Sequence, residues 1–301
     1  MTMEQMSKPL VTSEELAQMM ASGEKVVTID VRDVEEYEAG HVPGAVNIPD
    51  VFYYLATTDP EGLKELQEKF ATLFGQAGLT GEEMAVVYEE GFSLKSPRGY
   101  WLLEYLGYPK VLVLQGGMRG WRKGEYPVDT ESMPMNGSPE AFPLDVDPSV
   151  LCTVDEMLAS LDDPNVVKLD VRDKEEWVAE SSSPYEVDFS PRKGRIPGAT
   201  WIDWNLLLSL GEETKGSFKV TEDKGECKDL TEVEKMLEDK GVTKDRDVTL
   251  YCFKGARTSN TYLAMKMLGY ENVKTYFGSW NEWSQDENLP IEQGVPEEEV
   301  A

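Results

Sequence analysis

Apolar residues in this chain form short β-branched runs that alternate with longer segments of helical spacing. Runs at 26–31, 84–88 and 111–114 predict strands, because they are short, apolar and bounded by turn residues. The segments 62–74 and 98–106 between them predict helices. Strands that alternate with helices are typical of an α/β fold, so we predict a parallel β-sheet flanked by helices on both faces.

The same plan occurs twice along the chain. Residues 27–37 read VTIDVRDVEEY, and residues 167–177 read VKLDVRDKEEW. The motif HVPGA at 41–45 is matched by RIPGA at 195–199. The second pair of motifs lies further apart in the chain than the first pair, so the second copy contains an insert, roughly residues 180–194. Its Ser and Pro content predicts a loop. Repeats in a conserved order predict two domains of one architecture.

The length of the chain supports the same division. A chain of 301 residues exceeds the usual size of one compact domain. A stretch rich in Pro, Ser, Asp and Met lies near the middle and is typical of a linker. We therefore predict an N-terminal domain at 1–130, a linker at 131–148 and a C-terminal domain at 149–301.

Charge and cysteine content restrict the partners and the compartment. The chain has 57 acidic against 29 basic residues, a formal net charge of -28, which repels nucleic acids and anionic membranes. Its cysteines at 152, 227 and 252 form no close pair, which argues against a zinc site or a disulfide framework. No apolar stretch reaches membrane-spanning length. We expect a soluble, cytoplasmic protein with reduced thiols that binds neither nucleic acid nor membrane.

The most informative segment follows a predicted strand that ends at Tyr251. Cys252 comes next, and a helix with Thr258 or Ser259 as its predicted cap begins a few residues later. In an open α/β sheet, ligands bind at the carboxyl ends of the strands. Cys252 is therefore expected at the position where such a fold binds its ligand.

The surroundings of Cys252 favour a thiolate over a thiol. Lys254 and Arg257 supply positive charge, and the start of a helix adds N–H groups and the positive end of its dipole. Gly255 allows the positive φ that a tight loop around the sulfur requires. The same groups suit a small anion or a persulfide on Cys252.

The other candidate nucleophiles and bases have no comparable surroundings. Cys152 and Cys227 are interpreted as structural, and a role as a resolving thiol stays open. His41 is the single histidine and lies in a turn motif, so a Cys–His catalytic pair is not supported. Chemistry without a general base fits this residue set: a thiolate attacks an electrophilic sulfur and expels a stable anion.

These motifs together resemble the tandem rhodanese family of thiosulfate and 3-mercaptopyruvate sulfurtransferases. DVR followed by HVPGA is similar to the family's amino-terminal signature, and GSWNEW at 278–283 is similar to its carboxy-terminal signature. The resemblance implies two rhodanese-like domains, with Cys252 as the catalytic residue of the second. It implies a degenerate first domain, because Glu89 or Glu90 stands at the matching position. The residues implied to bind substrate are Phe253, Lys254, Gly255, Ala256, Arg257 and Thr258.

The resemblance also bears on the sulfur donor. Lys254 is typical of members that prefer thiosulfate, and Glu176 stands where many mercaptopyruvate enzymes have an arginine. Arg257 differs from the threonine of vertebrate-like members. We expect a thiosulfate sulfurtransferase with 3-mercaptopyruvate as the alternative donor, and with cyanide, a thiol, or a thioredoxin-like or sulfur-carrier protein as acceptor. No cofactor or metal is implied.

Four residues near the motifs are assigned to the scaffold: Asp170 and Arg172 fix the loop backbone, and Trp280 and Trp283 form a cleft wall or core. Two other functions remain as alternatives. A phosphatase or arsenate reductase would place five residues between cysteine and arginine, whereas four separate them here. A binding or persulfide-sensing module without catalysis is the alternative from another class, and the intact cationic loop argues against it.

Overall fold

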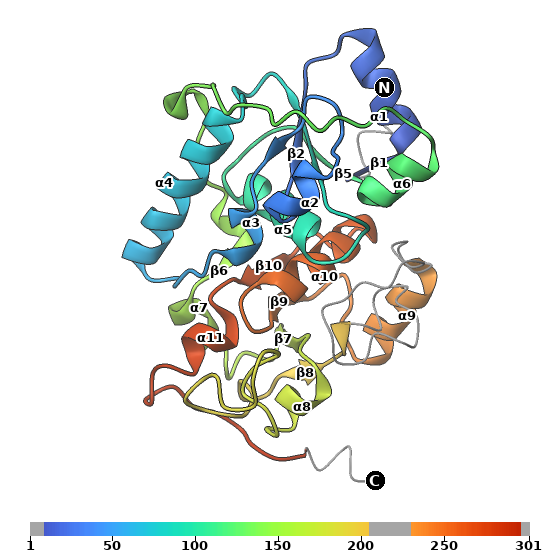
Figure 1. The fold of residues 1–301 in the computed structure, drawn as a ribbon. Coiled ribbons are helices and arrows are strands. Elements are labelled where there is room, and N and C mark those ends of the chain that lie inside the picture. The colour runs from blue at the N-terminus through green and yellow to red at the C-terminus, as the bar shows by residue number, and fades with distance from the viewer. Residues whose placement is uncertain (1–8, 205–229, 296–301) are drawn as a thin grey trace. The chain divides into compact units, whose positions relative to one another are not determined.

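The computed structural model describes residues 9–204 and 230–295 (Figure 1). The chain divides into two compact units, one containing residues 9–54 and 64–147, the other containing 55–63, 148–204 and 230–295. Each unit holds one five-stranded parallel sheet with flanking helices, as the repeat predicts. The α/β fold class, with a parallel sheet and flanking helices in each half, is confirmed.

The first sheet has the strand order β1-β5-β4-β2-β3. Its strands are β1 (Leu10–Val11), β2 (Val26–Asp30), β3 (Val46–Asn47), β4 (Met84–Tyr88) and β5 (Val111–Leu114). The helices of this half are α1 (Ser13–Ser22), α2 (Val34–Glu38), α3 (Asp50–Tyr53), α4 (Pro60–Gln76), α5 (Lys95–Tyr105) and α6 (Gly117–Lys123).

The second sheet repeats this order as β6-β10-β9-β7-β8. Its strands are β6 (Leu151–Cys152), β7 (Val166–Asp170), β8 (Thr200–Trp201), β9 (Asp247–Tyr251) and β10 (Val273–Tyr276). The helices of this half are α7 (Val154–Ala159), α8 (Lys174–Trp177), α9 (Leu230–Asp239), α10 (Ala256–Met267) and α11 (Ser279–Trp283). Two short 3₁₀ turns, Pro139–Ala141 and Pro148–Val150, precede them.

The central strands align in the same register in both sheets. Asp30 pairs with Tyr88 across β2 and β4, and Asp170 pairs with Tyr251 across β7 and β9. Each of β4 and β9 therefore ends level with an aspartate that is the last residue of the neighbouring strand in its own sheet. The residue that follows each tyrosine, Glu89 or Cys252, begins the loop at the carboxyl edge of its sheet.

Helix starts follow local capping rules in both units. The side chain of Thr12 accepts from the backbone N–H of Glu15, whose carboxylate accepts from the Thr12 N–H, and Thr153 with Glu156 repeats this capping box. The observed α5 begins at Lys95, three residues before the predicted start. Pro97 explains the difference, since proline is tolerated in the first turn, where its missing N–H has no intrahelical partner.

The segment predicted as a linker packs along the first unit. Gly137 donates its N–H to the Gln76 carbonyl at 2.9 Å, and Asp145 donates to the Leu106 carbonyl at 3.1 Å. Phe142 is buried between aromatic rings of α4 and the loop before β5. Contacts place this segment in the first unit as far as Asp147.

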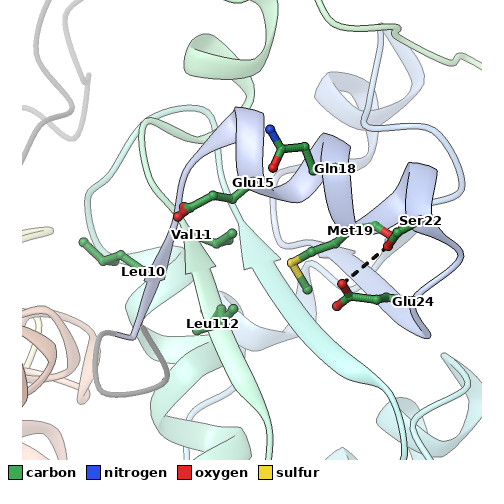
Figure 2. A pocket seen from close by; sticks show the side chains of 8 residues that line it. All are labelled: Leu10, Val11, Glu15, Gln18, Met19, Ser22, Glu24 and Leu112. Carbon is green, nitrogen blue, oxygen red and sulfur yellow. Dashed lines mark hydrogen bonds between the residues drawn. The ribbon is translucent and has the colours of Figure 1, made fainter. Parts of the chain in front are cut away.

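A pocket of about 360 Å³ opens in the first unit between α1 and the β1 edge (Figure 2). It is lined by Leu10, Val11, Glu15, Gln18, Met19, Ser22, Glu24 and Leu112. None of the residues predicted to bind substrate lines it. No helix in the described ranges is long and apolar enough to cross a membrane.

Candidate active site

Cys252 lies immediately after β9, at the carboxyl edge of the second sheet, and is 1% exposed. The loop that follows curls back, and the backbone N–H of Gly255 donates to the Cys252 Sγ at 3.2 Å. Gly255 has φ of 82°, and a Cβ there would lie 2.8 Å from a ring carbon of Phe277. Both observations explain why glycine is needed at this turn.

The start of α10 differs from the prediction. Its N-cap is Gly255, not Thr258 or Ser259. Both hydroxyls instead donate to the Gly255 carbonyl, at 2.9 Å from Thr258 and 2.6 Å from Ser259. Because α10 begins at Ala256, directly after the left-handed Gly255, the backbone N–H of Thr258 in its first turn acts on the Cys252 sulfur.

The pKa of the Cys252 thiol is lowered. Burial opposes the charged form, but the positive charge of Arg257 and backbone N–H groups of Thr258, Lys254 and Gly255 favour it and outweigh burial. The site therefore favours the thiolate, which is the nucleophilic form of cysteine.

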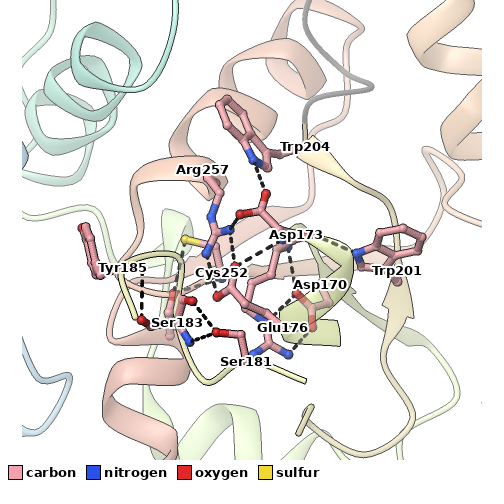
Figure 3. A network of polar contacts seen from close by, with 12 residues as sticks. Asp170, Asp173, Glu176, Ser181, Ser183, Tyr185, Trp201, Trp204, Cys252 and Arg257 are labelled. Atoms are coloured by element: carbon pink, nitrogen blue, oxygen red, sulfur yellow. Dashed lines mark hydrogen bonds and ion pairs between the residues drawn. The ribbon is translucent and has the colours of Figure 1, made fainter. Parts of the chain in front are cut away.

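Arg257 forms ion pairs with two carboxylates (Figure 3). Its guanidinium contacts Glu176 at 2.5 and 3.0 Å and Asp173 at 3.1 Å, and Arg257 and Glu176 are almost fully buried. Asp173 also accepts from the indole N–H of Trp204 at 3.0 Å. The charge of Arg257 acts on Cys252, while its N–H groups are directed at α8 and its N-cap.

Sequence reasoning did not find the contact between Glu176 and Arg257. The signal was present, because Glu176 is the third residue of a helix that starts beside the predicted strand edge. Burial raises the pKa of Glu176, while Arg257 opposes that rise. A buried carboxylate beside the cationic loop that follows Cys252 therefore belongs to the candidate site.

Phe253 and Lys254 contact the insert of the second copy. Phe253 is buried, and its ring meets those of Tyr185 and Phe189 edge-on, with centroids 5.6 and 5.7 Å apart. The Lys254 Nζ lies 5.3 Å from the centroid of the Tyr185 ring. The insert was predicted as a loop, and its contact with the cysteine loop comes from the structure alone.

The remaining predicted residues are buried around the loop. Ala256 and Thr258 lie in the first turn of α10 and are 4% and 0% exposed. The loop residues Phe253, Lys254 and Gly255 and the helix residues Ala256, Arg257 and Thr258 all lie next to Cys252 in the chain. Whether each contacts substrate stays a prediction.

Asp170 and Arg172 form a buried pair under the site. The Arg172 Nε and Nη2 donate to the Asp170 carboxylate, and Nη2 also donates to the Gly194 carbonyl at 2.8 Å. The guanidinium carbon lies 4.7 Å from the centroid of a Trp280 ring. Trp280 and Trp283 are fully buried in the core of this unit. These contacts agree with a scaffold role for all four residues.

The other cysteines and the histidine have separate environments. Burial raises the pKa of Cys152 to about 12, so this thiol stays protonated at neutral pH. Cys227 lies outside the described residues. His41 is fully buried, and its Nδ1 lies 2.8 Å from the Tyr37 carbonyl, in the turn that was predicted for it.

The first unit has Glu89 at the position of Cys252. The Met118 N–H donates to the Glu89 carbonyl at 2.8 Å, as the Trp280 N–H donates to the Cys252 carbonyl at 3.0 Å. The Glu89 carboxylate accepts from the backbone N–H groups of Ser93 and Ser96 and from the Ser96 hydroxyl. The prediction left Glu89 and Glu90 open, and this correspondence selects Glu89.

Comparison with known proteins places this geometry in a family. The rhodanese-like domain family matches residues 12–124 and 153–286. A thiosulfate sulfurtransferase of Azotobacter vinelandii is 28% identical over 286 residues, covering 95% of this chain and 98% of that protein. A 3-mercaptopyruvate sulfurtransferase of Escherichia coli K12 is 28% identical over 278 residues, covering 92% of this chain and 90% of that protein.

Solved structures support the fold. The crystal structure of YnjE superposes with a TM-score of 0.79 at 21% identity, covering 96% of this chain and 69% of that one. Wild-type EanB superposes with a TM-score of 0.77 at 23% identity, covering 96% and 70%. The two sulfurtransferases that are similar over nearly the whole chain support a sulfurtransferase role. Because the family model matches both halves, the chain belongs to the rhodanese family, with one rhodanese-like domain in each half.

Proposed function

We propose that the chain is a thiosulfate sulfurtransferase that carries sulfane sulfur as a persulfide on Cys252. The main support is the lowered pKa of a buried thiol that accepts a hydrogen bond from the Gly255 N–H. A thiolate that is held in place and shielded from solvent is the nucleophile that this reaction requires.

The reaction proceeds in two balanced half-reactions. The Cys252 thiolate attacks the outer sulfur of thiosulfate, a new S–S bond forms, and the S–S bond of thiosulfate breaks with its electron pair leaving on sulfite. Cyanide or an acceptor thiolate then attacks the outer persulfide sulfur and regenerates the Cys252 thiolate. Neither step needs a proton transfer, a cofactor or an external oxidant, which agrees with the lack of a histidine in the second half of the chain.

The cationic residues of the loop have different roles in this mechanism. Glu176 and Asp173 bind the guanidinium of Arg257, so Arg257 acts chiefly through its charge on the thiolate. Lys254 and the N–H groups at the start of α10 then bind the sulfonate oxygens of thiosulfate and stabilise the departing sulfite. The loop N–H groups also hold the persulfide anion.

Two residues favour thiosulfate over 3-mercaptopyruvate. The relatives that act on each donor are both 28% identical to this chain, so identity does not separate the donors. Lys254 supplies a cation two positions after the cysteine, as in thiosulfate-preferring members of the family. Glu176 is a buried carboxylate where many mercaptopyruvate enzymes have an arginine, so this position lacks the cation that would bind the carboxylate of mercaptopyruvate.

The acceptor and the compartment complete the proposal. We assign a cytoplasmic location, where thiols stay reduced, and a thiol or cyanide as acceptor, with a thioredoxin-like or sulfur-carrier protein as the macromolecular case. The net charge of -28 argues against nucleic acid and anionic membrane as partners, because it repels both at long range.

Steady-state kinetics test the proposed function. Thiocyanate formation is measured while thiosulfate and cyanide are both varied, and parallel double-reciprocal lines are expected for a persulfide intermediate. Cys252→Ala should be inactive, and Cys152→Ala, a buried cysteine outside the loop, should match wild type. Intersecting lines, or activity in Cys252→Ala, would contradict the proposal. Activity with 3-mercaptopyruvate but not with thiosulfate would show that 3-mercaptopyruvate is the sulfur donor. Hydrolysis of an aryl phosphate would indicate a phosphatase.

A further inference from the structure

Ser279 has a backbone conformation that is unfavourable for serine. Its φ is 53°, in the left-handed region, and its side chain is fully buried at the first residue of α11. Residues with a Cβ avoid this region, because the Cβ approaches the following carbonyl oxygen. Such strain at a buried position beside a candidate active site calls for a compensating contact.

The first unit shows that the fold does not require a serine here. Gly117 begins α6 at the matching position and has φ of 54°. Each of these residues precedes the N–H that binds the loop carbonyl, that of Glu89 in the first unit and that of Cys252 in the second. A Cβ at Gly117 would lie 2.3 Å from the Glu89 carbonyl oxygen. The second unit therefore accommodates a strained side chain at a position where the first unit, which has Glu89 in place of Cys252, excludes one.

The hydroxyl of Ser279 contacts the cysteine. The backbone N–H of Cys252 donates to the Ser279 Oγ at 3.2 Å, and the Oγ donates to the Tyr276 carbonyl at 2.8 Å. The Oγ also lies 4.0 Å from the Cys252 Sγ. Helix α11 thus binds both sides of the Cys252 backbone, because the Trp280 N–H donates to the Cys252 carbonyl.

We propose that Ser279 is a positioning residue for Cys252, and that its backbone strain is maintained for this contact. The hydroxyl fixes the Cys252 N–H, and its single proton can turn from the Tyr276 carbonyl towards the sulfur when the sulfur is negative. The proton donor stays on the enzyme throughout, so no proton is consumed. This inference rests on the proposed role of Cys252 as the sulfur carrier.

Alkylation of Cys252 tests the positioning role without any sulfur transfer. Wild type, Ser279→Ala and Ser279→Gly are treated with iodoacetamide between pH 5 and 10, and modification is followed by mass spectrometry of the peptide containing Cys252. Loss of the hydroxyl should raise the pH midpoint of Cys252 alkylation by about half to one unit in both variants, because one hydrogen-bond donor to the thiolate is lost. Ser284→Ala is the matched control, since it removes a buried hydroxyl, five residues further along, that makes no hydrogen bond to any residue that the structure describes.

Thermal stability distinguishes the backbone strain at Ser279 from the contact that its hydroxyl makes with Cys252. Ser279→Gly keeps a residue that accepts positive φ, so it should melt at a higher temperature than Ser279→Ala while showing the same shifted midpoint. A midpoint in both variants equal to those of wild type and Ser284→Ala would overturn the proposal. If the midpoints shift but wild type forms no persulfide, the role of Ser279 beside the thiolate stands and the proposed sulfurtransferase mechanism fails.

Discussion

Replacing Glu176 with glutamine should lower stability and strengthen thiosulfate binding at the same time. Glu176 and Arg257 form a buried ion pair at 2.5 Å, with side chains 1% and 4% exposed. Glutamine keeps the shape and the position in the capping box of α8, but removes one negative charge. The two effects have opposite signs because the same carboxylate stabilises Arg257 and opposes an incoming anion.

The loss of stability follows from the buried guanidinium. Removing one partner of a buried ion pair costs about 3–5 kcal/mol, because the other charge remains in a low-dielectric environment. Asp173 still lies 3.1 Å from Arg257, so the lower end of that range, about 3 kcal/mol, applies here. At about 2–4 °C per kcal/mol for a domain of this size, the melting temperature should fall by roughly 6–12 °C.

The gain in binding follows from the field at the cysteine. A unit charge about 8–16 Å from a bound anion contributes about 1–2 kcal/mol at an effective dielectric constant of about 20. The KM for thiosulfate should therefore fall by about fivefold to 25-fold, since about 1.4 kcal/mol corresponds to tenfold. Thiocyanate formation at pH 8 and low ionic strength measures this change.

Glu36→Gln provides the matched control. Glu36 occupies the same capping-box position in the first unit, where it is exposed and accepts from the Asp33 N–H. This variant should leave both the melting temperature and the KM close to wild type. If Glu176→Gln raised the KM or left it unchanged while lowering stability, the electrostatic role assigned to Glu176 would be refuted.

Four further predictions concern the cysteine loop. Arg257→Gln should raise the pH midpoint of Cys252 alkylation by about one unit or more, because it removes the largest interaction that favours the thiolate. Because the folded-state pKa of Cys252 is lowered, its thiolate adds stability above the ordinary thiol pKa and loses it as pH falls through the folded pKa. Urea unfolding of wild type against Cys252→Ser from pH 6 to 9 should show a growing advantage for wild type. Gly255→Ala should lower the melting temperature and the transfer rate, since a Cβ there would meet Phe277 at 2.8 Å. Lys254→Ala should lower kcat/KM for thiosulfate about tenfold, because it weakens both donor binding and stabilisation of the departing sulfite, and an unchanged kcat/KM would exclude Lys254 from both roles.

Local sequence patterns predicted most of the fold. The strands at 84–88 and 111–114 have the predicted bounds, because short β-branched runs ending at turn residues have few alternatives to a buried parallel strand. The repeated DVRD motif correctly predicted two matching sheet edges, since each aspartate closes a strand and each following aspartate caps a helix. The cysteine at the end of β9 followed from the same reasoning.

Contacts between distant residues could not be predicted in this way. The pairing of Glu176 with Arg257 depends on how α8 packs against α10, which no local pattern specifies. The choice between Glu89 and Glu90 required the hydrogen bond from Met118. The strain at Ser279 is invisible in the sequence, because the motif GSW accepts serine without any sign of positive φ.

The mass of the intact protein after incubation with thiosulfate is the sharpest test of a persulfide on Cys252. Wild type should gain the mass of one sulfur atom, cyanide should remove it, and Cys252→Ala should gain nothing. An equal gain in Cys252→Ala would place the sulfur on another residue. No gain in wild type with thiosulfate or 3-mercaptopyruvate would contradict a persulfide on Cys252 and favour a binding module.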